Sequence, residues 1–287
     1  MNKLWLLSLS LFLFPAACNN SSSGRQSEKP IVVVSIEPQQ YVMDFLGKDD
    51  FKVITLLDRG SDPETFEPTA AKRLMADKAD LFLAVGSLPF EDKFAANLSD
   101  NVKTYKSDKG IKYIFGTHSH GHSHEDEHCG DPHIWSSPSG MKIVGSNMAE
   151  ALVLTYPHMK DSIYSRLSKF NNHVDSIDES LKLRLSAAPV HAFAVWHPSL
   201  SYLARDYALE QISVGQESKE MSSQQIRSVI DQAREKGVKI FFFQREYDSR
   251  QAKVLNSEIG SRLVVVEPLS KDWEGQLNLI VNELVKP

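Results

Sequence analysis

Short apolar runs rich in β-branched residues alternate with helix-like segments along this chain, and the alternation occurs twice. The runs that predict strands are 31–36, 51–57, 80–85 and 111–115 in the first half, and 191–196, 211–214, 238–244 and 262–266 in the second. Strands separated by helices are typical of parallel sheets, because a parallel connection has to cross the sheet. We therefore expect an α/β protein with two mainly parallel sheets flanked by helices.

A different pattern separates the two halves. From 139 to about 187 the sequence has no glycine after Gly145 and a single proline, Pro157. This predicts one long helix with a kink at Pro157, because proline lacks an N–H donor and clashes with the preceding turn. The predicted domains are an N-terminal lobe at 31–137, a rigid linking helix at 138–187 and a C-terminal lobe at 188–287. We expect the ligand site in the cleft between the lobes.

The N-terminus has the layout of a secretion signal. Lys3 precedes an apolar run at 4–14, which ends in small residues before Cys18. The run is too short for a membrane-spanning helix, which needs roughly 20 residues. A cysteine directly after Ala-Ala resembles the bacterial lipobox, in which the thiol is acylated and becomes the first mature residue; an ordinary signal peptide is the alternative. We expect a signal peptide at 1–17, a lipid on Cys18 and a flexible polar tether at 18–30.

Charge and cysteine content argue against nucleic-acid binding and against an internal disulfide. The formal net charge is -5, so the chain has no basic surface of the kind that binds nucleic acid. The only other cysteine is Cys129, so a lipid on Cys18 excludes an internal disulfide and leaves Cys129 as a metal ligand or a free thiol. We expect an exported monomer, anchored to a membrane on its periplasmic or cell-surface side.

The segment 117–130 gathers half of the histidines of the chain. Five of the ten histidines lie within eleven residues, interleaved with acidic residues: His118, His120, His122, His124 and His128. Imidazoles at this spacing suit zinc, copper or nickel, so we expect an auxiliary metal-binding loop; a solvated polar loop is the alternative. Residues 124–128 also match the H-E-x-x-H pattern of zinc proteases, but their Gly, Ser and charged neighbours provide no apolar helix face, which argues against a protease.

Four further polar residues follow or lie close to predicted strand ends, which is where ligands bind in open α/β sheets. Glu64 lies in the loop after the second predicted strand, and His133 follows the histidine-rich segment. His197 and Glu267 come directly after predicted strands of the second half. Each has a structural alternative, as a charge at a helix N-terminus or a packed histidine. Together, two imidazoles and two carboxylates predict a four-ligand site for zinc or manganese.

Several segments resemble the metal-specific solute-binding proteins of ABC importers, the ZnuA-like family. The similarity runs along the whole mature chain, and its most specific parts are DPETFEPT at 62–69, DPHIWSSP at 131–138, HPSLSYLARDYAL at 197–209 and VVVEPL at 264–269. The resemblance implies an extracytoplasmic receptor, not an enzyme, that binds zinc with high affinity and delivers it to the membrane permease of the importer. It also implies that the lobes clamp the ion with little hinge motion.

The sequence departs from the family pattern at two of the four ligand positions. Glu64 stands where the family usually has histidine, and Glu267 stands where the fourth ligand is commonly aspartate. Two histidines with two carboxylates resemble the manganese receptors, whereas His197 and the histidine-rich segment favour zinc. We therefore expect zinc, with three alternatives: a manganese receptor of the same fold, a metal-binding adhesin or storage lipoprotein, or a zinc-dependent hydrolase.

Overall fold

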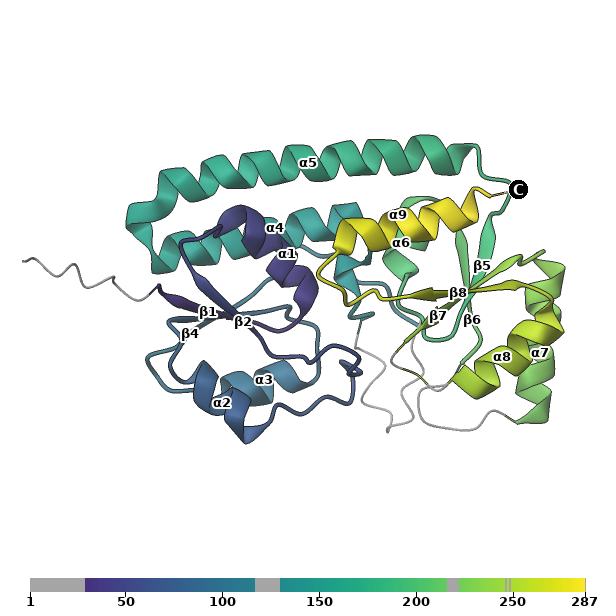
Figure 1. The fold of residues 1–287 in the computed structure, drawn as a ribbon, viewed down its shortest axis with the longest axis horizontal. Coiled ribbons are helices and arrows are strands. Elements are labelled where there is room, and N and C mark those ends of the chain that lie inside the picture. The colour runs from purple at the N-terminus through teal and green to yellow at the C-terminus, as the bar shows by residue number, and fades with distance from the viewer. Residues whose placement is uncertain (1–28, 117–129, 216–221, 246, 248, 287) are drawn as a thin grey trace, which may run out of the picture.

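Two sheets of four parallel strands form the framework of the protein (Figure 1). The structure is a computed structural model that describes residues 29–116, 130–215, 222–245, 247 and 249–286. The first sheet has the strand order β2-β1-β3-β4, formed by β1 (Ile31–Val34), β2 (Lys52–Thr55), β3 (Leu81–Ala84) and β4 (Lys103–Lys106). The second sheet repeats this order as β6-β5-β7-β8, formed by β5 (Ala192–Val195), β6 (Glu210–Ser213), β7 (Ile240–Gln244) and β8 (Arg262–Val266). The predicted α/β class with parallel sheets is confirmed.

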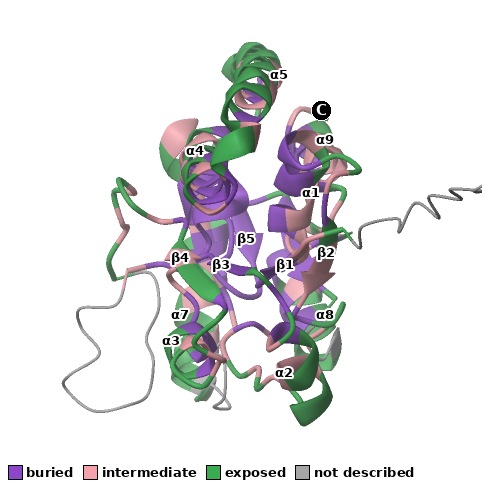
Figure 2. Ribbon diagram, turned by 90° about the vertical axis from the view of Figure 1, so that its left-hand side faces the viewer, coloured by how far each residue is buried: buried purple, intermediate pink, exposed green. Residues whose placement is uncertain are grey.

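Helices cover the sheets and bury their central strands. The helices that connect strands are α1 (Glu37–Leu46), α2 (Ala70–Ala76) and α3 (Phe90–Ala95) in the first lobe, and α6 (Ser201–Asp206), α7 (Ser223–Glu235) and α8 (Ser249–Ile259) in the second, with α9 (Trp273–Leu284) at the end. β3, β5 and β7 are buried at every residue, as expected for parallel strands covered on both faces; Figure 2 shows this for β3 and β5. None of the helices within the described ranges is both long and apolar enough to cross a lipid bilayer.

The fourth strand of the first sheet lies outside the segment where the sequence predicts it. The prediction of a strand at 111–115 is wrong, because these residues have no regular structure and β4 pairs with β3 instead. The apolar side chains of Ile111, Tyr113 and Ile114 pack against the core from an irregular segment, which explains their apolar pattern. β4 is an edge strand with mostly exposed side chains, so its sequence lacks the apolar run on which the prediction relied.

The stretch between the lobes is a helical hairpin, not the single kinked helix that the sequence predicts. α4 (Pro138–Thr155) ends before Pro157, a short 3-10 turn follows, and α5 (Lys160–Ser186) runs back along α4. Lys142 pairs with Asp175 at 2.5 Å, and a Cβ on Gly145 would come within 2.4 Å of the Phe170 ring. Proline disfavours helical backbone at the residue before it, and here the chain reverses at that point.

α5 runs along both lobes and connects them (Figure 1). Near its start, Arg166 Nη1 donates to the Leu46 carbonyl at 3.0 Å and pairs with Asp50 at 2.6 Å, in the first lobe. Near its end, Arg184 Nη1 donates to Asn278 Oδ1 of α9 at 2.9 Å, in the second lobe. The main hydrophobic core also includes side chains of both sheets. Relative motion of the lobes therefore has to disrupt a shared core as well as the helix contacts.

Replacement of Phe170 by alanine tests the packing of this hairpin. The ring is fully buried and meets the ring of Phe45 edge-on, with centroids 5.3 Å apart. We expect Phe170→Ala to lower the free energy of unfolding by about 3–5 kcal/mol in urea titrations, because the cavity can only partly collapse. Lys169→Ala, at the exposed neighbouring position, should change it by less than about 0.5 kcal/mol. Equal effects of the two variants would contradict this packing.

Candidate metal centre

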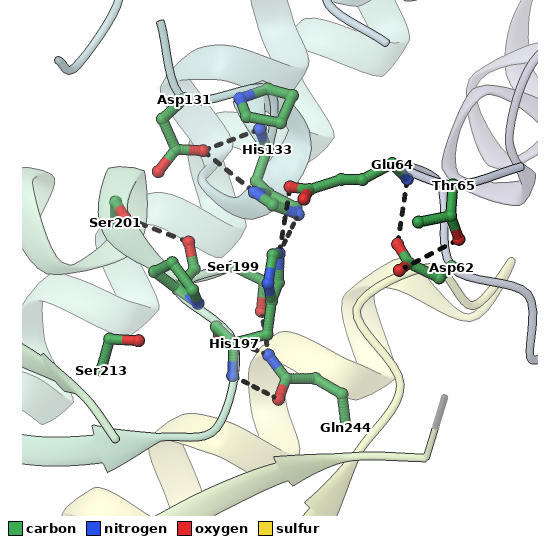
Figure 3. A network of polar contacts seen from close by, with 12 residues as sticks. Asp62, Glu64, Thr65, Asp131, His133, His197, Ser199, Ser201, Ser213 and Gln244 are labelled. Carbon is green, nitrogen blue, oxygen red and sulfur yellow. Dashed lines mark hydrogen bonds and ion pairs between the residues drawn. The ribbon is translucent and has the colours of Figure 1, made fainter. Parts of the chain in front are cut away.

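Glu64, His133 and His197 meet between the two sheets (Figure 3). The Nε2 atoms of the two histidines are 3.2 Å apart, and His197 Nε2 lies 3.5 Å from Glu64 Oε1. One donor atom from each residue lies within 4.8 Å of the other two. The histidines are 2% and 3% exposed, and the Glu64 side chain is 7% exposed. Three of the four side chains that the sequence predicts as ligands are therefore brought together in a buried group.

The end of β5 positions His197. β5 and β7 are the neighbours between which the strand order of the second sheet reverses, and ligands bind at such switch points in open α/β sheets. Gln244, at the end of β7, accepts from the backbone N–H of His197 at 3.3 Å and donates to its carbonyl at 2.6 Å. The same amide donates to Ser199 Oγ at 2.7 Å, and the imidazole stacks on Tyr247. A buried glutamine thus fixes the loop that carries this histidine.

A buried carboxylate orients His133. Asp131 Oδ1 accepts from the backbone N–H of His133 at 2.9 Å and lies 3.0 Å from its Nδ1. Asp131 is 1% exposed, so this interaction is shielded from water. With Nδ1–H donating to the carboxylate, Nε2 carries the lone pair and faces Nε2 of His197. Carboxylates placed behind metal-binding imidazoles fix the tautomer and ring orientation in this way.

The second lobe holds the segment that carries His133. The Tyr202 hydroxyl of α6 donates to the Asp131 carbonyl at 2.7 Å, and Trp273 Nε1 of α9 donates to the Trp135 carbonyl at 2.7 Å. Burial raises the pKa of Tyr202, which keeps the hydroxyl protonated and able to donate. The chain on each side of His133 is therefore bonded to the lobe that supplies His197, and this sets the distance between the two rings.

Glu64 is presented by a tight turn after β2. Asp62 Oδ1 accepts from the backbone N–H of Glu64 at 2.9 Å, and Thr65 Oγ1 donates to the other Asp62 oxygen at 3.3 Å (Figure 3). Aspartate side chains that bond to the backbone two residues on stabilise turns of this kind. The turn directs the Glu64 side chain toward the two imidazoles.

The spacing of the donor atoms suits a bound ion. Around a tetrahedral zinc ion with bonds of about 2.0–2.1 Å, two ligand atoms are about 3.3 Å apart. The contacts of 3.2 Å and 3.5 Å in this group are close to that separation. Two imidazoles with a carboxylate are also a donor set that zinc accepts. The residues therefore fit a zinc-sized ion and leave one tetrahedral position for another ligand.

Glu267 follows β8 as the sequence predicts, but its carboxylate has other partners. It accepts from Arg59 Nη2 at 2.6 Å and pairs with Arg245 Nη1 at 2.9 Å. Among the described residues, the donor group includes Glu64 and the two histidines but not Glu267. The role of Glu267 as the fourth ligand stays a prediction.

The sequence prediction gave Asp131 and Arg59 no role at this site, and for 244–247 it favoured an ordinary strand-to-helix loop over contacts with the site. Asp131 could have been found, because it lies two residues before a predicted histidine ligand, and Gln244 because it ends a strand next to His197. Arg59 and Arg245 are remote in sequence from Glu267, and neither lies in a recognisable motif. Only the fold brings these two side chains to the carboxylate.

The predicted auxiliary loop and anchor lie outside the described residues. This applies to the five histidines His118, His120, His122, His124 and His128, to Cys129, and to the signal peptide with Cys18. Their roles stay predictions.

The fold and the three converging side chains define a class: two-lobed α/β proteins with a candidate cation site between parallel sheets. The chain belongs to the family described as zinc-uptake complex component A, periplasmic, whose model matches residues 32–284.

Curated relatives are about a quarter identical to this chain over the aligned residues. The zinc-binding protein AdcA of Streptococcus pyogenes serotype M1 is 26% identical over 297 residues, which cover 94% of this chain and 56% of that protein. The high-affinity zinc uptake system protein ZnuA of Bacillus subtilis is 27% identical over 283 residues, covering 91% and 87%. The chain thus spans about half the length of its streptococcal relatives, because the match covers 56% of each of those proteins.

Solved structures agree with the fold. The crystal structure of a ZnuA superimposes with a TM-score of 0.83 at 28% identity, over 90% of this chain and 98% of that one. A manganese-bound periplasmic metal-binding protein from Candidatus Liberibacter asiaticus has a TM-score of 0.76 at 23% identity, over 89% and 100%. The second comparison supports the fold alone.

Substitution of Asp131 tests how His133 is oriented. In Asp131→Asn the residue keeps its size, but its amide no longer supplies a charged acceptor for Nδ1–H. We expect metal affinity to fall about 10- to 100-fold, as found when such carboxylates are removed from other metal sites. Titration of the purified protein with Zn²⁺ in competition with a chelator measures the change. Asp175→Asn, which removes an exposed ion pair on α5, should leave the affinity unaltered; a similar loss in both variants would contradict the assignment.

Proposed function

We propose that this protein is an extracytoplasmic zinc receptor that delivers the ion to the membrane permease of an ABC importer. Glu64, His133 and His197 bind the ion, and Glu267 is the candidate for the fourth position. The observation that carries the proposal is the buried group of three donor atoms, spaced like ligands of one ion and drawn from both lobes. The names of the relatives, a zinc-binding protein and a zinc uptake system protein, support the same function.

The donor set favours zinc over manganese. Manganese prefers oxygen ligands, whereas a set with two imidazoles suits zinc. The 3.2 Å between the two Nε2 atoms is compatible with neighbouring ligands of either ion, so the preference for zinc rests on the ligand types. Manganese remains the second candidate, because the manganese-bound protein shares the fold and because the set includes carboxylates.

Binding, not catalysis, is the role that we propose for this centre. A catalytic zinc site needs a bound water next to a group that can take its proton. Glu267, the acidic side chain expected at the fourth position, is paired with two guanidinium groups. These two contacts occupy both carboxylate oxygens, so Glu267 is not placed to take a proton from a water at the open position. This argues against the zinc-dependent hydrolase that the sequence leaves open.

The anchor and the histidine-rich segment have supporting roles in this proposal. A lipid on Cys18 holds the folded body at a membrane surface without a spanning helix. A further relative, from Streptococcus pneumoniae and 26% identical over 287 residues, is named a zinc-binding lipoprotein, which supports such an anchor. The five histidines of 117–130 gather zinc near the receptor at low affinity. An adhesin or storage lipoprotein would bind zinc in the same way but would not supply a permease. Measurement of zinc uptake by cells therefore distinguishes a transport receptor from these alternatives.

Metal titration of the mature protein tests the proposed site. We expect one tight zinc site, which His133→Ala with His197→Ala abolishes and Glu64→Ala weakens by tenfold or more, about 1.4 kcal/mol. Deletion of 117–129 should remove weak extra binding and leave the tight site. The measurement is isothermal titration with chelator competition, with metal content determined on the purified protein.

His191→Ala is the matched control, because this exposed histidine lies at the other end of β5 from His197. Its zinc affinity should equal that of the unmodified chain. Tight binding that survives loss of His133 and His197 but disappears with the 117–129 segment would show that the proposed site is wrong.

A further inference from the structure

Glu267 lies between two arginines from different lobes. Arg59, in the loop after β2, donates to Glu267 Oε2 at 2.6 Å, and Arg245, which follows β7, pairs with Oε1 at 2.9 Å. These three residues line a cavity of about 220 Å³ together with Glu37 and Ser270. Each arginine side chain is 67% exposed, whereas that of Glu267 is 16% exposed. The carboxylate is thus held from both sides at the mouth of the interlobe region.

The backbone at Glu267 is fixed relative to the candidate metal centre. The backbone N–H of Glu267 donates to Gln276 Oε1 at 2.8 Å, and the carbonyl of Pro268 accepts from Trp135 Nε1 at 3.0 Å. Trp135 lies two residues after His133, so the segment that carries Glu267 is bonded directly to the segment of a proposed ligand. Rotation of the Glu267 side chain would therefore change the distance between its carboxylate and the candidate metal centre without breaking these backbone contacts.

The strand order puts Glu267 within reach of the same ion as His197. β7 separates β5 from β8, so the strand ends that carry His197 and Glu267 are roughly 10 Å apart. Arg245 follows the strand between them and pairs with Glu267. An imidazole and a carboxylate that extend toward each other can span this separation. Arg245 is consequently placed to compete with a bound ion for the Glu267 carboxylate.

We propose that Arg59 and Arg245 form a latch that holds Glu267 off the ion, and that opening of this latch supplies the fourth ligand. This inference rests on the proposed zinc site. Glu64 and the two neutral imidazoles leave one tetrahedral position open and part of the positive charge of Zn²⁺ uncompensated. Glu267 can fill that position only after it leaves the two guanidinium groups. The latch therefore weakens zinc binding and speeds zinc release.

The contacts of the latch are weak enough for Glu267 to exchange the two arginines for a bound ion reversibly. Ion pairs with exposed arginines are weak and are screened by salt, so a divalent ion can displace them. The hydrogen bond to the Glu267 carboxylate raises the pKa of Arg59, so the guanidinium group stays charged over the physiological range. Because one arginine comes from each lobe, a contact that moves either loop would alter the competition. Docking to a permease is a contact of this kind.

A double-mutant cycle tests the latch. The variants are Arg59→Gln with Arg245→Gln, Glu267→Gln, and all three substitutions together, made in the mature full chain. Zinc affinity is measured by chelator competition, and zinc release is measured by stopped flow with an excess of chelator. We expect the arginine pair variant to bind zinc about three- to tenfold tighter and to release it more slowly, in keeping with the loss of two exposed ion pairs.

The cycle separates a latch from a simple charge effect. In the Glu267→Gln background, the arginine substitutions should change the affinity by less than about twofold, because no carboxylate is left to release. An equal gain in both backgrounds would mean that the arginines act on the ion by long-range repulsion, which overturns the latch. Unaltered or weaker binding in the arginine pair variant would also overturn it.

Two controls show whether a change in zinc binding is specific to the latch arginines. Arg234→Gln removes an exposed arginine that pairs with Glu258, on helices of the second lobe, and should leave zinc affinity and release unaltered. Thermal unfolding confirms that each variant is folded. If the latch alone is wrong, zinc binding still depends on His133 and His197. If zinc binding does not depend on those histidines, the proposed function fails and the latch fails with it.

Discussion

The hydrogen bonds that the second lobe makes to the segment around His133 are the constraint on which the candidate centre depends. A metal site tolerates errors of only about 0.2 Å in its ligand distances, yet its donors here come from both lobes. Tyr202 and Trp273 bond to carbonyls on either side of His133, and Trp135 bonds back to the second lobe. Because the lobes also share one hydrophobic core, the two imidazoles are held together before any ion arrives.

Because the shared core and the contacts of α5 oppose hinge motion, the backbone fixes the positions of the ligands and only side chains are left to move. Large hinge motion would have to break the shared core and the contacts of α5 with both lobes. Small movements of side chains remain available, and the partly exposed ion pairs of Glu267 are the contacts best suited to them. In this account the buried histidines determine where the ion binds, whereas the exposed arginines determine how firmly it is held.

Local patterns in the sequence predicted most of the framework, because parallel strands buried on both faces leave uninterrupted apolar runs. The edge strand β4 was not predicted, because its residues Lys103–Lys106 are largely exposed and form no apolar run. The hairpin at Pro157 was missed because the residues on both sides of the turn are helix-like, and packing of α4 on α5, not the local sequence, decides between a kink and a reversal. Glu64 and His197 were predicted as ligands because they follow strands, and His133 because it follows the histidine-rich segment, with the family resemblance supporting all three. The partners of Glu267 were not, because Arg59 and Arg245 reach it only through the tertiary fold.

Anomalous X-ray diffraction at the zinc absorption edge tests the central claim most directly. Crystals of the mature protein grown with one equivalent of zinc should give one dominant anomalous peak, in contact with Glu64 and with Nε2 of both His133 and His197. A dominant peak at any other position, such as the histidines of 117–130, with none between His133 and His197, would contradict the account.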